Sequence, residues 1–481
     1  MNEPGPRPLP IELLRSLIGQ VRRRFPWPVR PTDKAGDRPP KHPTEPQEPE
    51  DEQIGAERYR AQIRVVRNAL GDGVAVAPKR GRKRPDDDAE AAYLYRPGVA
   101  LVRPEDMPRV DRYFEEQRDR YHGQIERIEN RAGLVELSLP RRRDDQDDVL
   151  ATLEELDEAV GKGVVTPDHL VYVTSWGYLC PASEPEEPRS QRPWPPPQAV
   201  SEEEPSERDR VRVAVVDTGL WKDAVGSPET PWLEPDDIFA DLPDEEHVNP
   251  AAIHEYAGHG TFVAGVISCM APDTRVEVEG VLTNGGAVYE SEICAQLHDA
   301  LTDSDNPQLI SISAGTHTRL GMALLGFTVL AAAHDLPRRS DVLIVAAAGN
   351  DRTDEPFWPA AFPWVVAVGS VDPDRKVSDF SNYGRSWVDI YARGRNLVNA
   401  FPKGTYVCHE PPHVNEVRHF HGLAQWSGTS FSTPVVTGLI AARMRAAKED
   451  ARTAWKAVQA TATSYHDTRI NEDIRIVGPL T

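Results

Sequence analysis

The sequence predicts an α/β protein in which a large domain with a mainly parallel sheet follows a small α+β domain. From residue 211 onward, short Val/Ala/Ile-rich runs such as VRVAVV (211–216) and VLIVAAA (342–348) alternate with helical segments. Strands that are apolar on both faces are typical of parallel sheets covered by helices on both sides, which predicts three layers. Strand and helix patterns also alternate within 93–175, and they predict the small domain.

Composition excludes several classes of protein. The 481 residues include 55 Lys and Arg against 76 Asp and Glu, a net charge of −21 that argues against binding to nucleic acid or anionic membranes. The four cysteines are scattered and imply no disulfide scaffold. No run approaches about 18 apolar residues, so no membrane span is expected. The N-terminus lacks the features of a signal peptide, which predicts a cytoplasmic protein.

The first 92 residues are rich in proline and charge, and they are expected to be mostly disordered. Within them, IELLRSLIGQVRRRF (11–25) has the apolar spacing of a short amphipathic helix. The basic stretch PKRGRKRP (78–85) precedes an acidic run, which favours a solvated linker over a nucleic-acid patch.

A small α+β domain is predicted over 93–180, with helices on one side of a sheet. Its expected elements in order are a strand, a helix, a strand, a helix and a strand, over 95–102, 108–128, 132–140, 147–163 and 169–174. A Pro/Glu-rich extended linker is expected over 181–210. The large α/β domain is expected over 211–481.

Three reactive residues stand where strands end or helices begin in the large domain. Asp217 follows the strand VRVAVV, His259 lies between two glycines at the start of an apolar helix, and Ser430 opens another helix. Reactive groups gather at such junctions in open parallel sheets. Each residue alone has an ordinary structural explanation, such as a helix cap. Together they supply an acid, a base and a hydroxyl nucleophile.

The segments that carry these residues resemble the subtilisin-like serine peptidases, or subtilases. The matching motifs are VAVVDTG (213–219), HGTFVAG (259–265), VAAAGN (345–350) and GTSFSTPVVTG (428–438), in the family's order. Weaker similarity fills the gaps, so the resemblance covers about half of the chain.

The resemblance implies a fold, an activity and a set of site residues. It implies a subtilisin-like domain in which Ser430 attacks a peptide carbonyl, His259 transfers the proton and Asp217 orients the imidazole. Asn350 would donate to the oxyanion. An extended peptide would bind between two strands, and small side chains would line a roomy apolar pocket for its first side chain. The residues implied for binding are Gly285, Gly286, Ala287, Ser313, Ala314, Gly315, Ala346–Gly349 (which includes Ala347) and Ala360.

Some segments depart from the family pattern. The chain after the His259 helix leaves little room for the family's long calcium loop, so that calcium site is expected to be absent. The family's Ala-Pro-Gly turn appears here as Ala392-Arg393-Gly394. An insert at 399–426 contains Cys408, His409, His413, His419 and His421. Zinc is one interpretation of the insert, and a lid over the active site is the favoured one, so no metal and no cofactor are expected.

Several alternatives remain open at this level. The leading hypothesis is a serine endopeptidase acting on a peptide or protein substrate. The rivals are a catalytically silent peptide-binding relative, an esterase, whose Gly-x-Ser-x-Gly elbow is not matched at Ser432, and a metal-dependent binding protein. Many relatives begin with an inhibitory α+β propeptide, and residues 93–175 have a compatible order. This region is therefore expected to restrain the enzyme, either as a removable propeptide or as a retained domain that senses a regulatory partner.

Overall fold

The computed structural model describes residues 49–79, 87–123, 125–143, 149–173, 184–199, 210–282, 285–304 and 306–480. The chain divides into two units, 1–46 and 47–481, and all described residues belong to the second unit. The helix predicted over 11–25 and positions 80–85 of the basic stretch lie outside the described residues.

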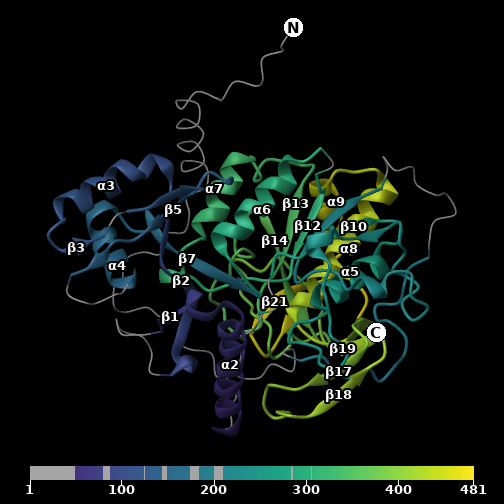
Figure 1. Ribbon diagram of the computed structural model, residues 1–481. Coiled ribbons are helices and arrows are strands. Elements are labelled where there is room, and N and C mark those ends of the chain that lie inside the picture. The colour runs from purple at the N-terminus through teal and green to yellow at the C-terminus, as the bar shows by residue number, and fades with distance from the viewer. Residues whose placement is uncertain are drawn as a thin grey trace. The chain divides into compact units, whose positions relative to one another are not determined.

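The elements of the described residues are drawn in Figure 1. The helices are α2 (Pro49–Leu70), α3 (Met107–Glu116), α4 (Val149–Val160), α5 (His259–Met270), α6 (Glu290–Thr302), α7 (Leu325–Ala333), α8 (Thr429–Ala447) and α9 (Ala451–Ala460). The strands are β1 (Ala75–Pro78), β2 (Ala91–Val102), β3 (Tyr121–His122), β4 (Arg127–Glu129), β5 (Val135–Ser138), β6 (Arg141–Arg142), β7 (Val165–Tyr172), β8 (Arg212–Val216), β9 (Ile238–Phe239), β10 (Arg275–Glu279), β11 (Ala287–Tyr289), β12 (Leu309–Ile312), β13 (Leu343–Ala347), β14 (Val365–Val371), β15 (Ile390–Arg393), β16 (Leu397–Ala400), β17 (Gly404–Val407), β18 (Val417–Phe420), β19 (Leu423–Trp426), β20 (Thr463–Asp467) and β21 (Glu472–Ile476).

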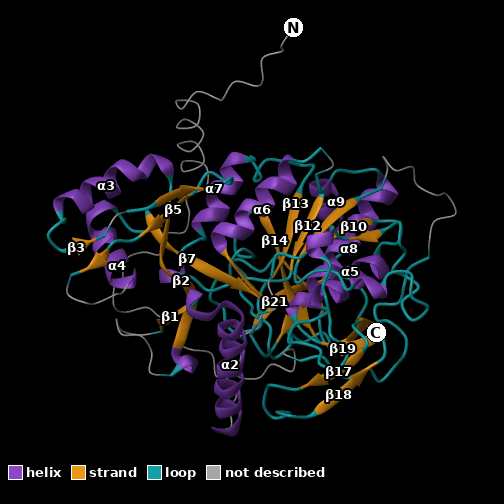
Figure 2. Ribbon diagram, in the orientation of Figure 1, coloured by secondary structure: helices purple, strands orange, loops and turns teal. Residues whose placement is uncertain are grey.

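A nine-stranded sheet forms the centre of the large domain, in the order β20-β21-β15-β14-β13-β12-β8-β10-β9. Its neighbouring strands are parallel from β21 to β9, and only the edge strand β20 is antiparallel. Helices α6 and α7 are drawn on one side of the strands and α5, α8 and α9 on the other (Figures 1 and 2). The predicted three-layer α/β domain with a mainly parallel sheet is therefore confirmed.

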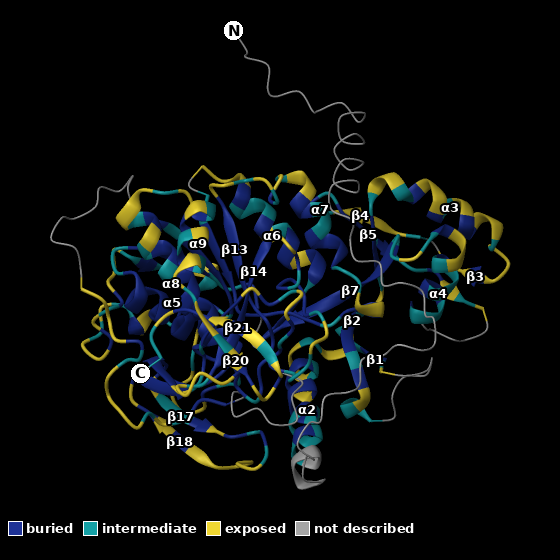
Figure 3. Cartoon of the chain, turned by 180° about the vertical axis from the view of Figure 1, so that it is seen from behind, coloured by how far each residue is buried: buried dark blue, intermediate teal, exposed yellow. Residues whose placement is uncertain are grey.

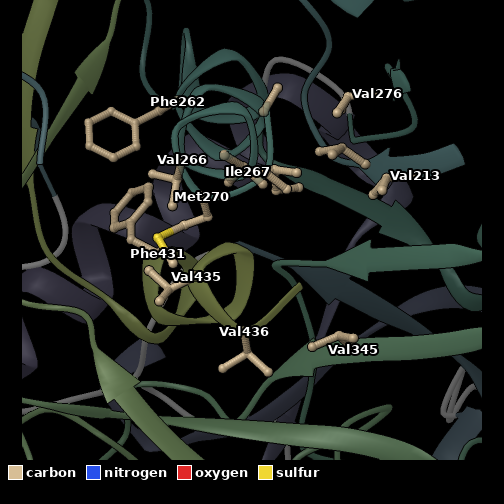
Figure 4. Close-up of a cluster of buried hydrophobic side chains, with 14 of the residues drawn as sticks. Val213, Phe262, Val266, Ile267, Met270, Val276, Val345, Phe431, Val435 and Val436 are labelled. Carbon is tan, nitrogen blue, oxygen red and sulfur yellow. The ribbon is translucent and has the colours of Figure 1, made fainter. Parts of the chain in front are cut away.

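The core between the sheet and helices α5 and α8 is built from apolar side chains of low exposure (Figure 4). Parallel strands buried on both faces require such continuous apolar runs, and the helix residues fill the space above them. Because Phe431 is 1% exposed within this core, it anchors the first turn of α8, which carries Ser430. Labelled members of the core are Val213, Phe262, Val266, Ile267, Met270, Val276, Val345, Phe431, Val435 and Val436.

The small domain is built on a second sheet, in the order β11-β7-β2-β5-β4, with β1 also paired to β2. Helices α3 and α4 pack on it through buried side chains such as Val110, Phe114, Leu153 and Leu156. The helix predicted over 108–128 is wrong in length. It ends at Glu116, because the chain turns back after Gln117 and forms β3 and β4.

Two segments expected to be unstructured are ordered in part. Residues 49–79, placed in the mostly disordered N-terminal segment, form α2 and β1, and they share a buried core with Leu170, Tyr172 and Ala287. Tyr59, Ile63 and Val66, spaced along one face of α2, supply the apolar area that a folded helix needs. Residues 184–199 of the expected linker lie along the large domain, where Glu186 pairs with Gln425 and Trp194 with Val398.

Buried residues concentrate in the central sheet and in the strands β2 and β7 of the small domain, as Figure 3 shows. Among the helices of the described ranges, none combines the length and the apolar character needed to cross a membrane.

Candidate active site

The carboxyl ends of neighbouring parallel strands bring the predicted residues to one edge of the central sheet. Asp217 directly follows β8, Ser313 directly follows β12, and Asn350 follows β13 by three residues. Because these three strands are adjacent and parallel, their ends lie side by side. The fold therefore collects at one edge groups that are far apart in the sequence.

Asp217 and His259 form a buried hydrogen-bonded pair. The Nδ1 atom of His259 lies 2.6 Å from Oδ1 of Asp217, which also accepts a 2.8 Å bond from the backbone N–H of Thr218. Asp217 is fully buried and His259 is 3% exposed. A carboxylate at Nδ1 holds the proton on that nitrogen and leaves Nε2 with a lone pair. The pair can therefore act as a general base through Nε2.

Aromatic side chains pack around the His259 imidazole and fix its plane. The ring of Trp426 stands edge-on at a centroid distance of 5.4 Å, and Phe431 lies at 5.2 Å. Trp426 closes β19 at the end of the 399–426 insert, so the insert contributes directly to this site.

Ser430 is the second residue of α8 and is tied to the end of β12. Its hydroxyl donates to the Ser313 carbonyl oxygen at 3.2 Å, and the Ser313 hydroxyl donates to the Ser430 carbonyl oxygen at 2.9 Å. In the described part of the chain, the Ser430 hydroxyl donates to the Ser313 carbonyl. A hydrogen bond from this hydroxyl to Nε2 of His259 therefore requires rotation of the serine side chain. The next residue, Phe431, packs against the imidazole at the ring-centroid distance of 5.2 Å, so His259 contacts the first turn of α8.

The side-chain amide of Asn350 is oriented by Thr429, the residue before Ser430. Its Oδ1 accepts from the Thr429 backbone N–H at 2.8 Å and from the Thr429 hydroxyl at 3.0 Å. Both bonds use the amide oxygen, so the amide nitrogen is the end that can donate to an incoming group. The buried Asn350 is thus held next to the start of α8 with its donor available.

The strands implied for substrate binding do flank a peptide segment, and that segment comes from the small domain of the same chain. Tyr172 and Gly315 exchange two backbone hydrogen bonds of 3.1 Å, and Val173 donates to the Gly286 carbonyl at 2.9 Å. On the other edge, β11 pairs antiparallel with β7 through Ala287. An extended peptide is thus bound by strand addition on both sides.

The pairing at this edge requires a residue without a side chain at position 286. A Cβ atom at Gly286 would lie 2.6 Å from the Val173 side chain and 2.9 Å from the ring of Tyr256, and its φ of +63° is unfavourable for other residues. At the neighbouring Gly285, a Cβ would lie 2.7 Å from Ala69 of helix α2. Helix α2 therefore packs directly against the edge where the peptide binds.

The remaining predicted residues lie around the same edge. Ala314 is buried in the segment between Ser313 and Gly315, and Ala347 ends β13. The backbone N–H of Gly349 donates to the Thr429 hydroxyl at 3.1 Å. Ala360 is buried, 1% exposed, in the segment that follows Asn350.

Sequence reasoning missed Glu246, a buried carboxyl group next to this site. Its Oε2 accepts a 2.7 Å bond from the backbone N–H of Gly258, the residue before His259. Burial, with Asp217 nearby, raises the pKa of Glu246 well above the usual value for glutamate. No sequence motif marks this residue, because its role depends on how the loop 219–258 folds back.

The histidines of the 399–426 insert are dispersed over a hairpin formed by β17 and β18. His413 pairs with Glu416 at 2.8 Å, and His409 lies 3.3 Å from Glu255. Burial raises the pKa of the Cys408 thiol to about 12, which disfavours the thiolate that binds metals. Within the part of the chain that the structure describes, no group of three or more His, Cys, Asp or Glu residues is arranged to hold a metal ion.

An α/β domain with an Asp–His pair at the carboxyl edge of a parallel sheet, and a serine opening the adjacent helix, defines a hydrolase-like class of protein. The model of the subtilase family, Peptidase_S8, matches residues 208–474, more than half of the chain. The chain belongs to the subtilase family.

The chain is similar to several known proteins at moderate identity. The intracellular serine protease of Paenibacillus polymyxa is 29% identical over 48% of this chain and 65% of its own length. The major intracellular serine protease of Bacillus subtilis (strain 168) is 30% identical over 48% of this chain and 67% of its own length. A solved structure, the prenylagaramide maturation protease PagA, is 26% identical with a TM-score of 0.41, over 53% of this chain and 84% of that chain. The chain thus spans slightly less than two thirds of the Paenibacillus protein.

Proposed function

We propose that this chain is a serine endopeptidase that hydrolyses peptide bonds through Asp217, His259 and Ser430. The observation that carries the proposal is the 2.6 Å bond between Asp217 and His259 beside the first turn of α8. Membership of the subtilase family supports a serine-type peptidase, and the names of the two intracellular relatives support action inside the cell.

The proposed reaction begins when the Ser430 hydroxyl turns from the Ser313 carbonyl to Nε2 of His259. Its proton passes to Nε2 as Oγ bonds to the substrate carbonyl carbon, and the carbonyl π electrons move to the oxygen. Asp217 stabilises the imidazolium that forms. The oxyanion accepts hydrogen bonds from the Asn350 amide nitrogen and from the Ser430 backbone N–H, a contribution of about 10²–10³ in turnover for one such donor.

The intermediate then collapses and the C–N bond breaks. The leaving amine takes the proton from His259, and an acyl group remains on Ser430. Water repeats the sequence with His259 again as base, which releases the acid and restores the serine. Binding of an extended substrate would use the strand edges at Gly286 and Gly315, where Val173 and Tyr172 bind in the unprocessed chain.

We further propose that the N-terminal part restrains this activity. Tyr172 and Val173 occupy the edges that a substrate needs, so a substrate and this segment compete for the same backbone groups. The segment is fastened by buried side chains of β7: Asp168 accepts from the backbone and hydroxyl of Ser291, and His169 lies 3.0 Å from Glu290. The 93–180 region is thus a propeptide or a retained regulatory domain.

The alternative is a catalytically silent subtilase that binds peptides. It shares the fold and the strand edges with the proposed enzyme, and it differs only in the reactivity of Ser430. The two hypotheses are therefore separated by a test of the serine itself.

The test treats the full chain with a fluorophosphonate probe and measures intact mass. We expect one probe per chain on the wild type and none on Ser430→Ala, because only a serine activated by His259 reacts readily. Ser432→Ala is the matched control: this serine lies one half-turn further along α8 and donates to the Thr429 carbonyl at 3.0 Å, so its loss should leave labelling intact. A wild-type protein that stays unlabelled after the N-terminal part has been removed by limited proteolysis would establish the silent alternative.

A further inference from the structure

One aromatic residue stands in the space that the peptidase needs for the side chain next to the bond it cuts. The family resemblance implies a roomy apolar pocket lined by the small residues Ala346–Gly349 and Ala360. Phe357, which no sequence motif singled out, lies among them and is 3% exposed. Its position sets how much room a substrate side chain has.

The place of that side chain follows from the proposed chemistry. The reacting carbonyl must lie within reach of the Ser430 hydroxyl, which is bonded to the Ser313 carbonyl, and of the Asn350 amide. The substrate residue that carries this carbonyl therefore lies between the 313–315 edge and the 348–350 segment. Its side chain has to enter the space between these two segments.

Phe357 occupies that space against both walls. A Cβ atom at Gly315 would lie 2.2 Å from Cε1 and 2.7 Å from Cδ1 of the Phe357 ring, and a Cβ at Gly349 would lie 2.9 Å from Cδ1. Distances below 3.0 Å mean that the ring rests directly on the backbone of both glycines. The absence of side chains at Gly315 and Gly349 does not leave an open pocket, because the ring fills the volume that they vacate.

The ring cannot swing away easily, because its backbone is paired. Trp358 exchanges two hydrogen bonds with Thr316, of 2.8 and 3.0 Å, and Ala361 donates to the Phe357 carbonyl at 2.9 Å. The imidazole of His317 packs edge-on against the ring at a centroid distance of 5.2 Å, and it is itself held 3.2 Å from Asp351. A side chain fixed on two faces and by its backbone is a permanent part of the wall.

We infer that Phe357 restricts the enzyme to peptide bonds that follow residues with small side chains, namely Gly, Ala, Ser and Thr. This inference rests on the proposed function and adds its substrate class. The chain's own sequence is consistent with it: the small residues Thr174 and Ser175 directly follow the segment that is bound at Gly315 and Gly286.

The experiment compares peptides that differ only in the residue before the scissile bond, Ala in one and Phe in the other. The full chain is incubated until self-processing ends, and kcat/KM is measured for both. The ratio for one preparation does not depend on the fraction that is active. We expect the wild type to favour Ala by at least about 100-fold, since a filled pocket excludes a large side chain. Equal or better cleavage after Phe in the wild type would overturn the inference.

The variant Phe357→Gly opens the space and should raise the Phe-to-Ala ratio by at least about tenfold. The matched control is Phe362→Leu, a buried aromatic residue that packs on Trp358 and stays clear of the two glycines, and its ratio should not change. An unchanged ratio in a folded Phe357→Gly would count against the inference, and should that variant not fold, the wild-type ratio decides alone. Fluorophosphonate labelling is run in parallel: a labelled protein with the wrong preference rejects only this inference, whereas an unlabelled one rejects the proposed function with it.

Discussion

At the scale of single residues, the turn that presents His259 depends on a buried acid. Gly258, at φ +74°, leads into α5, and its N–H donates to Glu246 at 2.7 Å. His254 Nε2 lies 3.8 Å from the other carboxyl oxygen. A protonated carboxyl group accepts the Gly258 bond without placing a second negative charge near Asp217. Burial, with Asp217 nearby, therefore favours the protonated form of Glu246.

This gives a prediction for the pH dependence of stability. Burial raises the pKa of Glu246 well above its usual value. The folded protein therefore keeps a proton on this carboxyl group that the unfolded chain releases at about pH 4.3. Between those two pKa values the unfolded state binds fewer protons, and the free energy of unfolding falls as pH rises. We expect Glu246→Gln, which keeps an acceptor for Gly258, to flatten this fall.

The measurement is the thermal unfolding midpoint from pH 5 to pH 8, made in the Ser430→Ala background to prevent self-digestion. Glu234→Gln, at an exposed position of the same loop, serves as the control and should keep the slope of the parent. If Glu246→Gln and its parent lose stability in parallel as pH rises, the carboxyl group is ionised in the fold and the prediction is wrong.

The site residues differ in whether the sequence could predict their role. Asp217, His259 and Ser430 lie in short motifs at strand ends and helix starts, so the sequence could single them out, and the structure bonds Asp217 to His259. Glu246 and Phe357 act through contacts with residues 8 to 42 positions away. Such contacts depend on loop paths, which local pattern and propensity do not determine.

At the scale of elements, helix α2 connects the strand edge at Gly285 to the 399–426 insert. Val66 packs at Gly285, while the Gln62 amide donates to the Glu410 carboxylate at 3.2 Å and Arg58 donates to the Pro411 carbonyl at 2.6 Å. Gln62 and Glu410 are both buried. The helix thus adds a second attachment for the N-terminal part, beyond the strand β7.

We predict that Gln62→Ala accelerates labelling of Ser430 in the full chain. Loss of a buried hydrogen bond to a charged group costs about 1–3 kcal/mol, which corresponds to roughly 5- to 150-fold in the population released from the site. The readout is the rate of fluorophosphonate labelling. Asn68→Ala, at an exposed position of the same helix, is the control and should label like the wild type. Identical rates for all three proteins would show that α2 does not restrain the site.

Elements were predictable where the pattern was long and regular. The parallel strands, with their continuous apolar runs, and α4, with its stacked apolar face, fell where expected. The helix over 108–128 was overextended because Gln117–Arg120 carries polar residues that suit a turn as well as a helix. The sequence did not indicate helix α2, because many of its residues are polar and a proline-rich stretch precedes it. Its buried face is covered by residues of two other regions, around Tyr172 and Ala287.

At the scale of the whole molecule, the chain is bound beside the proposed active site up to residue 173 and along the large domain from residue 184. Val173 donates to the Gly286 carbonyl, and eleven positions later Glu184 accepts from the Tyr406 hydroxyl at 3.0 Å and from the His409 backbone N–H at 2.6 Å. Further on, Trp194 pairs with Val398, and the Arg393 guanidinium stacks on its ring at 3.7 Å. Both flanks of the 174–183 stretch are therefore fastened independently.

This arrangement predicts where the protein cuts itself and what happens to the pieces. Because Tyr172 and Val173 are bound at the strand edges beside the proposed active site and Glu184 is held by the insert, the cut should fall within 174–183. Phe357 should favour a bond after one of the small residues of this stretch, such as Thr174 or Ser175. The β7 contacts with Gly315, Ser291 and Glu290 do not cross the cut, so both fragments should stay together. Intact mass under denaturing conditions should give two chains, and native mass one particle, while Ser430→Ala stays whole. A cut beyond residue 199 would contradict this path of the chain, and immediate separation of the fragments would mean that the β7 contacts do not hold the restraint in place.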